Sequence, residues 1–320
     1  MSRLTVIIPF LDEAENLPVL HEELCRVTDG KDFEAEFLFV DDGSKDGGPE
    51  WLLDKRQDDS RIRLVRLSRN FGHQVAISAG LDLAGGDAVV IMDADLQDPA
   101  AVIPAMVQKW RDGNDVVYAL RTDREGESAL KKVLAAVFYR LFRMAASVNV
   151  PVDAGDFRLL DRRVVEALRS MRETHRYLRA MTSWTGFRQA AVPYKRRPRH
   201  AGLTKYPIWK SIRLAWDGFT SFSGAPLRWV SGLGTVVCLA GALWLARIMV
   251  VQLRHPELQQ AGWPSIMGAV LLLGGVQLLA LGLLGQYMSR TYEESKRRPL
   301  YFVSYDSVSA AGVSGSRKAL

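Results

Sequence analysis

The sequence predicts an α/β protein: a doubly wound parallel sheet, followed by interfacial helices and a hairpin of two transmembrane helices. Three observations predict it. The first 125 residues alternate short apolar runs with helical patterns, acidic loops follow several of these runs, and two long apolar segments lie near the C-terminus. Alternation of strands and helices with short loops is typical of a parallel sheet that helices cover on both faces.

Five short apolar runs are the predicted strands, because strands buried on both faces of a parallel sheet are continuously apolar. They span residues 4–10, 35–42, 62–68, 87–94 and 115–121. Helical patterns separate them at residues 14–27, 48–58, 74–84 and 99–113. Asp98 stands directly before Pro99, and this pairing predicts the N-cap of the last of these helices.

Acidic loops follow three of the predicted strands: DEAEN at 12–16, DDGS at 41–44 and DADLQD at 93–98. Because the carboxyl ends of parallel strands meet at one edge of a sheet, we expect the loops to converge on a ligand site there. Alternation along an extended chain places Asp93 and Asp95 on one side, with Gln97 next. Carboxylate and amide oxygens suit Mg²⁺ or Mn²⁺, which also bind substrate phosphates. A role as the N-cap of the following helix explains why an acidic residue stands at Asp98, but it does not explain Asp93 and Asp95.

Two segments of 25 residues predict membrane-spanning helices. Residues 229–253 contain one charge, Arg247, and residues 264–288 contain none, whereas about 20 apolar residues suffice to cross a bilayer. A buried hairpin of a soluble core is the alternative, but no soluble segment of comparable size follows that could cover it. Basic residues flank the pair on its outer sides, at Lys205, Lys210, Arg213, Arg228, Arg290, Lys296, Arg297 and Arg298. This bias predicts cytoplasmic termini and a short outer loop.

The predicted domain organisation follows from these segments. Residues 1–203 form a cytoplasmic domain, 204–228 an interfacial segment, 229–288 the two spans and 289–320 a cytoplasmic tail. Residues 128–147 and 206–223 are basic and amphipathic, which suits either a position at the membrane interface or ordinary surface helices. The small residues Gly274 and Gly275 could serve a homo-oligomer or only the intramolecular hairpin.

Composition and missing motifs exclude several classes of protein. The net charge of +6 is a mild basic excess, and we expect no nucleic-acid partner. Cys25 and Cys238 lie far apart without a CxxC pattern, so no disulfide framework or structural zinc is predicted. GxGxxG, GxxxxGK[ST], HExxH and GxSxG are absent, which argues against dinucleotide, P-loop, zinc-protease and hydrolase sites. The histidines are expected to be surface or packing residues.

Several motifs together resemble glycosyltransferase family 2. They are VIIPFLDEAENL, FVDDGSKDG, SRNFGHQVAISAGL, GDAVVIMDADLQDP, VVYALRTDR and DAGDFRLLDRRVV. With the C-terminal membrane hairpin, they are more closely similar to the membrane-anchored polyprenyl-phosphate glycosyltransferases, over about residues 4–303. The resemblance implies a GT-A fold, a UDP-sugar donor and a polyprenyl phosphate acceptor.

The resemblance also implies roles for individual residues. Asp42 would contact the base of the nucleotide, in a site lined by Pro9 and Glu13. Asp93 would lie by the nucleoside, and Asp95 and Gln97 would hold the Mg²⁺ or Mn²⁺ ion on the diphosphate. Asp95 is thereby expected to be catalytic as well as a metal ligand.

Further residues match positions that act on the sugar and the phosphates. Asp156 in GDFRL matches the position proposed as catalytic, and Arg121 and Arg124 would bind phosphate. Lys132 falls where the family often has a basic residue for the lipid phosphate, and Lys205 lies in GLTKY, which resembles the family's GxSKY loop. A solvated surface charge is the alternative for both lysines.

The expected reaction is inverting transfer of one sugar, glucose being preferred, from a UDP-sugar to undecaprenyl or another polyprenyl phosphate. It would occur at the cytoplasmic leaflet of the inner (plasma) membrane and serve cell-envelope glycan modification, for example of lipopolysaccharide. Galactose, N-acetylglucosamine, mannose or an aminoarabinose derivative remain open as the sugar. A processive polysaccharide synthase is disfavoured because QxxRW is missing. A non-catalytic scaffold that binds nucleotide sugar is disfavoured by the intact acidic motifs.

Overall fold

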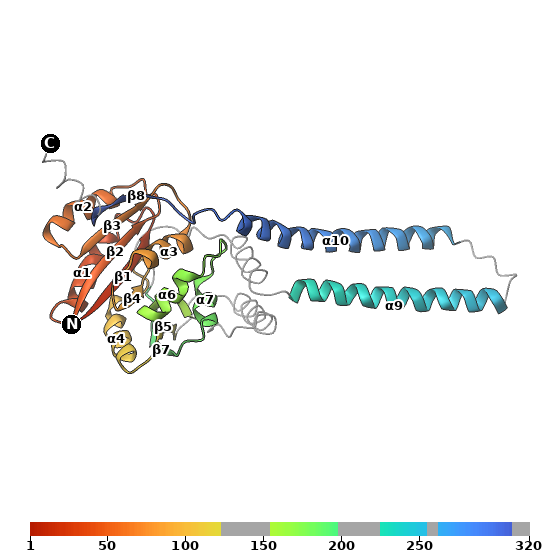
Figure 1. The fold of residues 1–320 in the computed structure, drawn as a ribbon, viewed down its shortest axis with the longest axis horizontal. Helices are drawn as coiled ribbons and strands as arrows, with labels where there is room; N and C mark the ends of the chain where they lie inside the picture. The colour runs from red at the N-terminus through yellow and green to blue at the C-terminus, as the bar shows by residue number, and fades with distance from the viewer. Residues whose placement is uncertain (123–153, 198–224, 255–261, 309–320) are drawn as a thin grey trace. The chain divides into compact units, whose positions relative to one another are not determined.

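A computed structural model describes residues 1–122, 154–197, 225–254 and 262–308 of the chain (Figure 1). These residues fall into two units. The first is an α/β unit that combines the N-terminal part of the chain with residues from Arg298 onward, and the second contains two long helices. The predicted interfacial segments 128–147 and 206–223 lie outside the described residues.

The predicted strands and helices of the first 125 residues are all present, with ends that differ by a few residues. The strands of this unit are β1 (Ser2–Phe10), β2 (Phe33–Asp41), β3 (Ile62–Leu67), β4 (Ala88–Ile91), β5 (Val116–Arg121), β6 (Ala154–Asp161), β7 (Gln189–Tyr194) and β8 (Val303–Asp306). Its helices are α1 (Leu17–Thr28), α2 (Gly48–Asp58), α3 (His73–Leu83), the short 3₁₀ turn η1 (Ala100–Val102), α4 (Ile103–Arg111), α6 (Arg162–Ser170) and α7 (Leu178–Trp184).

The sheet is mixed, which corrects the prediction of a parallel sheet. Its strand order is β7-β5-β6-β4-β1-β2-β3-β8, and β6 runs antiparallel between β4 and β5. No strand was predicted for residues 154–161, because Asp156 and Arg158 interrupt their apolar pattern although both side chains are buried. The antiparallel insertion places Asp156 next to the strand that carries the DADLQD loop.

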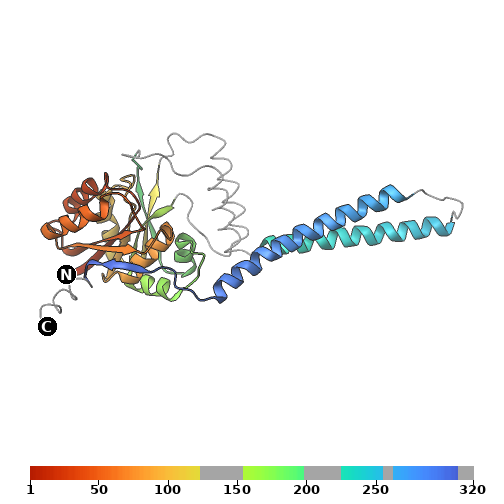
Figure 2. The ribbon, with the colours of Figure 1, turned by 90° about the horizontal axis from the view of Figure 1, so that it is seen from above.

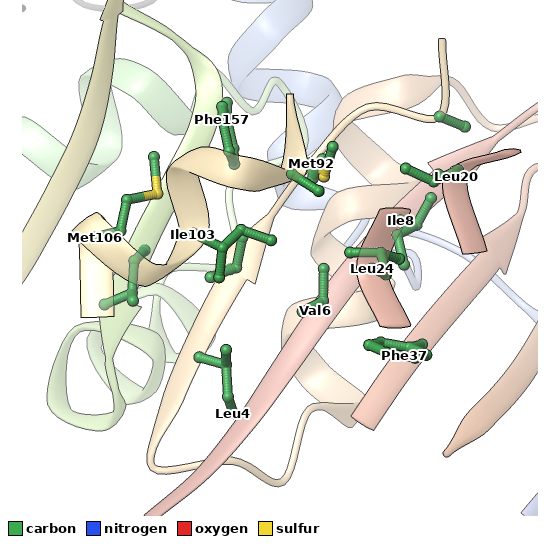
Figure 3. Close-up of a cluster of buried hydrophobic side chains, with 14 of the residues drawn as sticks. Leu4, Val6, Ile8, Leu20, Leu24, Phe37, Met92, Ile103, Met106 and Phe157 are labelled. Atoms are coloured by element: carbon green, nitrogen blue, oxygen red, sulfur yellow. The ribbon is translucent and has the colours of Figure 1, made fainter. Parts of the chain in front are cut away.

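The hydrophobic core lies between one face of the sheet and helices α1, α2 and α4 (Figure 3). Alternate residues of β1 point into it because side chains along a strand alternate between the two faces. The side chains that Figure 3 labels come from segments far apart in the sequence: Leu4, Val6, Ile8, Leu20, Leu24, Phe37, Met92, Ile103, Met106 and Phe157. This packing holds the carboxyl ends of β1, β2 and β4 in register.

Helices α3 and α6 cover the other face (Figures 1 and 2). Ile7 points to that face and lies against Gly80 of α3. Arg169 of α6 donates hydrogen bonds to the carbonyls of Leu81, at 2.8 Å, and Ala84, at 2.7 Å. The two helices are therefore joined at the end of α3, whose beginning lies at the carboxyl edge of the sheet.

The N-cap predicted at Asp98 is wrong. The chain turns into η1 after Pro99, without a side-chain cap. Asp98 is 1 % exposed, accepts a hydrogen bond from the hydroxyl of Tyr194, and lies 3.7 Å from Nε of Arg196. Its side chain therefore joins the loop after β4 to the end of β7, a contact that local sequence does not reveal.

The segment after the last long helix returns to the sheet as β8, which pairs antiparallel with β3. Arg63 contacts both carboxylate oxygens of Asp306, with Nε–Oδ1 and Nη2–Oδ2 distances of 3.2 and 2.8 Å. The amide of Leu64 donates to the hydroxyl of Ser307 at 3.0 Å. Residues 303–306, which were predicted only as part of a tail, thus belong to the sheet.

The second unit consists of α9 (Ala225–Arg254) and α10 (Trp263–Ser295), which contain the two predicted spans. Residues Gly268–Ser295 of α10 are long and apolar enough to cross a membrane, and their most apolar window of 18 residues has a mean hydropathy of 2.0. In α9 the described apolar stretch is shorter, Val230–Gly241. Among the described residues the structure therefore has one helix that meets the length and hydropathy of a span.

Candidate functional site

The loops that follow β1 and β2 are joined by hydrogen bonds. The amide of Asp12 donates to Oγ of Ser44 at 3.0 Å, and the amide of Lys45 donates to Oδ1 of Asp12 at 2.8 Å. The amide of Ala14 donates to Oδ2 of Asp46 at 2.8 Å. Two of the three acidic loops therefore meet at one edge of the sheet, as the strand order predicts.

Asp42 joins these loops to the segment that leads into α3. It is 4 % exposed and accepts hydrogen bonds from the amides of Phe71, at 2.7 Å, and Gly72, at 2.9 Å. Burial raises the pKa of this carboxyl, and the two amide hydrogen bonds oppose that rise. Gly43 has a φ of +87°, and a Cβ there would lie 2.8 Å from the amide nitrogen of Asn70. Only glycine fits this turn without displacing the neighbouring backbone.

Pro9 and Glu13 lie at the carboxyl end of β1 and in the loop after it. Pro9 is buried and faces Val40 of β2 in the register. Glu13 is half-buried, and its Oε2 accepts from Nδ2 of Asn16 at 2.5 Å at the start of α1. The amide of Asp42 donates to the carbonyl of Phe10 at 3.0 Å, which places Asp42 at the end of the strand that carries Pro9.

The loop after β4 turns sharply at Leu96, whose φ is +61°. Oδ1 of Asp95 accepts from the amide of Gln97 at 3.1 Å, and the carbonyl of Gln97 accepts from the amide of Arg197 at 2.9 Å. Asp95 is 8 % exposed and Gln97 is half-buried. The carboxylate of one predicted metal ligand is therefore bonded to the backbone of the other, and the segment after β7 supports this backbone.

Asp93 shows the electrostatic cost of this arrangement. Burial raises the pKa of Asp93 to about 6; His73 opposes the rise, while Asp156, Asp98 and Asp95 add to it. Its Oδ1 is buried, makes no hydrogen bond within the described residues and lies 3.4 Å from Nε2 of His73. Carboxylates crowded in this way fit a divalent cation, which lowers their repulsion and prefers oxygen ligands.

Asp156 is surrounded by three polar side chains from two helices. Arg179 of α7 donates from Nε to Oδ1 at 2.8 Å and from Nη2 to Oδ2 at 3.0 Å. Gln74 of α3 donates from Nε2 to Oδ2 at 3.3 Å. Nε2 of His73 lies 3.6 Å from Oδ2 of Asp156 and 3.4 Å from Oδ1 of Asp93. His73 thus connects the acidic loop after β4 with the carboxylate on β6.

The pKa values in this cluster follow from burial and charge. Burial alone would raise the pKa of Asp156, but Arg179 and His73 outweigh it and hold the pKa well below its ordinary range. Burial alone would lower the pKa of His73, but Asp156 and Asp93 outweigh it and raise that pKa to about 9. At neutral pH the cluster therefore contains an ionised Asp156 beside two cations.

His73, Gln74 and Arg179 are the members of this cluster that the sequence interpretation missed. His73 was expected to be a packing or surface residue, although SRNFGHQVA was among the motifs of the resemblance. Arg179 belongs to no motif and reaches Asp156 only because α7 packs beside β6. The GHQ triplet was the one local signal that could have pointed to His73 and Gln74.

Arg121, at the end of β5, lies against the backbone beside Asp156. Its Nε lies 3.2 Å from the hydroxyl of Tyr194, and a Cβ on Gly155 would lie 2.8 Å from its Nη2. Arg158 is 4 % exposed and donates from Nη2 to the carbonyl of Gly155 at 2.8 Å. Burial lowers the pKa of Arg158 to about 10. Two guanidinium groups therefore surround Gly155.

The other predicted phosphate-binding residues, Arg124, Lys132 and Lys205, lie outside the described residues.

A second polar cluster lies near the start of β3, at His21, Cys25 and Asp59. Within the described residues, one ligand atom from each lies within 4.8 Å of the others, a spacing that could hold a metal ion. However, Nη2 of Arg61 lies 2.8 Å from Oδ2 of Asp59 and 3.2 Å from Sγ of Cys25. The guanidinium already neutralises the carboxylate and would repel an added cation, so this cluster fits an ion-paired packing site.

Comparison with known proteins finds one family model that matches this chain, "Glycosyl transferase family 2", over residues 5–169. An "uncharacterized glycosyltransferase YkcC" of Bacillus subtilis is 42 % identical over 93 % of this chain and 92 % of its own length. A "bactoprenol glucosyl transferase" of Shigella phage SfV is 37 % identical over 94 % of this chain and 98 % of its own. A mannosyltransferase of Pyrobaculum calidifontis, solved with GDP-Man and Mn²⁺, has a TM-score of 0.49 at 18 % identity, covering 91 % of this chain and 88 % of that one.

Proposed function

The chain belongs to glycosyl transferase family 2, and from this premise we propose that it transfers one glucose from UDP-glucose to polyprenyl phosphate. Its mixed α/β sheet is GT-A-like, as the resemblance implied. The observation that carries the proposal is the similarity to bactoprenol glucosyl transferases, at 36–37 % identity over 94 % of the chain. The expected product is a lipid-linked glucose with inverted configuration at the anomeric carbon.

The donor would bind at the edge where the acidic loops meet. Pro9 and Asp42 lie at the neighbouring carboxyl ends of β1 and β2, and Glu13 follows in the loop after β1, which supports their proposed place around the base. Asp95 and Gln97 would hold a Mg²⁺ or Mn²⁺ ion on the diphosphate, and the crowding of Asp93 with Asp95 and Asp98, which adds to the raised pKa of Asp93, supports a cation there. Such an ion, when bound, neutralises the charge that develops on the departing UDP.

The acceptor needs cationic contacts because a lipid phosphate must approach a negatively charged donor. Arg121 lies beside Asp156, at the end of β5, which supports its proposed contact with phosphate. Arg124, Lys132 and Lys205 are proposed to bind the lipid phosphate. A phosphate monoester is largely a dianion at neutral pH, since its second pKa is about 6. The acceptor oxygen can therefore attack without a strong base.

The connectivity of the sheet supports two membrane spans. β8 follows α10 in the chain and pairs with β3, which precedes α9. If α10 crosses the membrane, a single crossing would leave β8 and β3 on opposite sides. An even number of crossings is needed, and α9 is the proposed second span. With basic residues on the outer flanks, both termini and the catalytic unit are proposed to be cytoplasmic at the plasma membrane.

A transfer assay tests the function. The purified chain in detergent is incubated with undecaprenyl phosphate, Mg²⁺ or Mn²⁺, and labelled UDP-glucose, UDP-galactose or UDP-N-acetylglucosamine in parallel. Label from UDP-glucose should pass into the lipid extract. Preference for another sugar would refute the choice of glucose, and binding without transfer from any donor would refute the enzymatic proposal.

Asp95→Ala, tested with the same substrates, addresses the metal site. This variant should lose transfer while its thermal unfolding stays close to that of the wild type, and excess EDTA should stop the wild type. Full activity of Asp95→Ala, or of the wild type in EDTA, would refute the proposal that Asp95 holds a divalent cation. Lys109→Ala, at an exposed position of α4, serves as the matched control and should keep full activity.

A further inference from the structure

The carboxylate of Asp156 is held from two directions. Arg179 makes a two-point contact with it, at 2.8 Å to Oδ1 and 3.0 Å to Oδ2. Asp156 is 8 % exposed and lies on β6, between two other strands of the sheet. A two-point contact between an arginine and a carboxylate is among the strongest neutralising pairs and fixes both groups in orientation.

Gln74 joins the two helices that hold this carboxylate. Its Nε2 donates to Oδ2 of Asp156 at 3.3 Å, while its Oε1 accepts from the amide of Leu178 at 3.0 Å, at the first residue of α7. Gln74 therefore holds both Asp156 and the helix that carries Arg179. The beginning of α3, including His73, and the beginning of α7 are arranged around one carboxylate.

We propose that Arg179 is a positioning residue that acts through Asp156. Together with Gln74 and His73, it holds Asp156 as an ionised carboxylate. This carboxylate orients the reacting groups and takes no proton from the acceptor. This inference rests on the proposed transfer of a sugar to a phosphate. In the balanced step, an oxygen of the phosphate dianion bonds to the anomeric carbon as the bond to UDP breaks. The UDP leaves with the electron pair, and no proton is transferred.

The charges around Asp156 explain why it would not act as a base. Arg179 from α7 and His73 from α3 face it, Arg158 lies on the same strand, and Asp93 from the loop after β4 is the opposing negative charge. Protonation of Asp156 would break part of its two-point contact with Arg179 and remove the negative charge that faces Arg179 and His73, which is unfavourable. An effective general base instead has a pKa near the working pH.

The first test compares pH profiles of kcat/KM for the wild type and Asp156→Asn between pH 6 and 9. If Asp156 orients groups, the variant is slower by a constant factor, on the order of 100-fold. If Asp156 accepts a proton from the acceptor monoanion, its loss would matter less where the acceptor is already a dianion. Convergence of the two profiles towards pH 9 would therefore overturn the proposal.

The second test changes Arg179. Arg179→Lys keeps the charge but loses the two-point geometry, so kcat should fall while the KM for the UDP-sugar stays close to that of the wild type. Arg179→Gln should also move the acid limb of the kcat profile to higher pH, because a buried carboxylate without its cation protonates more readily. Profiles that overlay the wild type in both variants would overturn the proposal.

Arg63→Gln is the matched control. Arg63 makes the same kind of two-point contact, with Asp306, near the amino end of β3 and away from the acidic loops. Loss of the contact between Arg63 and Asp306 should lower the melting temperature. It should leave kcat per folded molecule and the pH profile of kcat unchanged. An equal change of the profile in Arg63→Gln would show that the effect of Arg179 is only structural.

A readout without substrate separates this inference from the proposed function. Thermal unfolding of the full chain in detergent is measured from pH 4 to 8 in a background of His73→Gln and Asp93→Asn, with Asp156 and with Asp156→Asn, because both neighbours are coupled to Asp156 and would otherwise titrate in this range. An Asp156 that stays ionised predicts a constant difference in melting temperature between pH 5 and 8. A difference that changes around pH 6–7 would show a titrating Asp156 and overturn the inference. Absence of transfer by the wild type refutes the function alone, and the unfolding data still decide the state of Asp156.

Discussion

Replacing Asp98 by alanine distinguishes the buried contact that the structure shows from the helix N-cap that the sequence predicts. As an N-cap, the side chain would contribute about 1 kcal/mol to the free energy of unfolding. In the structure it is 1 % exposed and accepts from the hydroxyl of Tyr194, which is itself 6 % exposed. Removing it leaves a buried hydroxyl without its acceptor, at about 1–3 kcal/mol, and leaves Arg196 without the carboxylate 3.7 Å from its Nε. Because the side chain of Arg196 is 31 % exposed, the total loss is expected to lie near the lower end of the range for a buried charged contact, at about 3 kcal/mol.

Thermal unfolding of the full chain in detergent, followed by circular dichroism, measures this loss. For a unit of this size each kcal/mol corresponds to about 2–4 °C, so a loss of about 3 kcal/mol lowers the melting temperature of Asp98→Ala by about 6–12 °C. Asp98→Asn should lose less, because its amide oxygen can still accept from Tyr194. A drop of only about 2–4 °C in Asp98→Ala is the N-cap result and would refute the buried-contact reasoning.

A double-mutant cycle gives an independent check. If Asp98 and Tyr194 are in contact, the combined loss in Asp98→Ala with Tyr194→Phe should differ from the sum of the single losses by more than about 0.5 kcal/mol. Additive losses would contradict the contact. The pKa of Tyr194, which burial and then Asp98 raise to about 12, should fall in Asp98→Asn, as measured by ultraviolet titration of the phenol.

Three further predictions concern other parts of the α/β unit. Gly43→Ala should weaken donor binding in a calorimetric titration with UDP, since its φ is +87° and the new Cβ would lie 2.8 Å from the amide of Asn70; unchanged affinity would contradict a role for this turn. Phe37→Ala should cost about 3–5 kcal/mol of unfolding free energy, because Phe37 is fully buried in the core, and a loss below about 1 kcal/mol would contradict that packing. His73→Gln should melt below the wild type at pH 6, and the gap should close as the pH rises. The folded pKa of about 9 lies above the unfolded value near 6.5, so the stabilisation is complete below pH 6.5 and is lost as the pH rises through 9; a gap that widens with pH would contradict this sign.

Residues that act within a local pattern were predictable. The apolar runs of β1 to β5 and the intervening helices follow from periodicity, because burial on two faces demands continuous apolar strands. The acidic loops follow from their place after those strands, so Asp42, Asp93 and Asp95 could be named from the sequence. The two long helices follow from hydropathy and length alone.

Residues whose roles depend on strand order were not predictable. Asp156 was assigned from a motif, yet its place next to the DADLQD loop exists only because β6 inserts antiparallel beside β4. Asp98 precedes a proline in the manner of a cap, but the buried hydroxyl of Tyr194 competes for its carboxylate. The strand β8 carries too few apolar residues to be recognised alone, and it forms because β3 offers an unpaired edge.

The sequence by itself determined the α/β class, the edge at which acidic loops gather, the family resemblance and the apolar helices, because each depends on residue type at short spacing. Only the tertiary structure decided the mixed sheet, the return of the chain to β3 and the surroundings of Asp156. These features depend on which distant segments pack together. The free energy of packing comes from contacts between residues far apart in the sequence, and a local sequence pattern does not show these contacts. His73 and Arg179 belong to the site for that reason: α3 and α7 bring them to a carboxylate on a strand between them in the sequence.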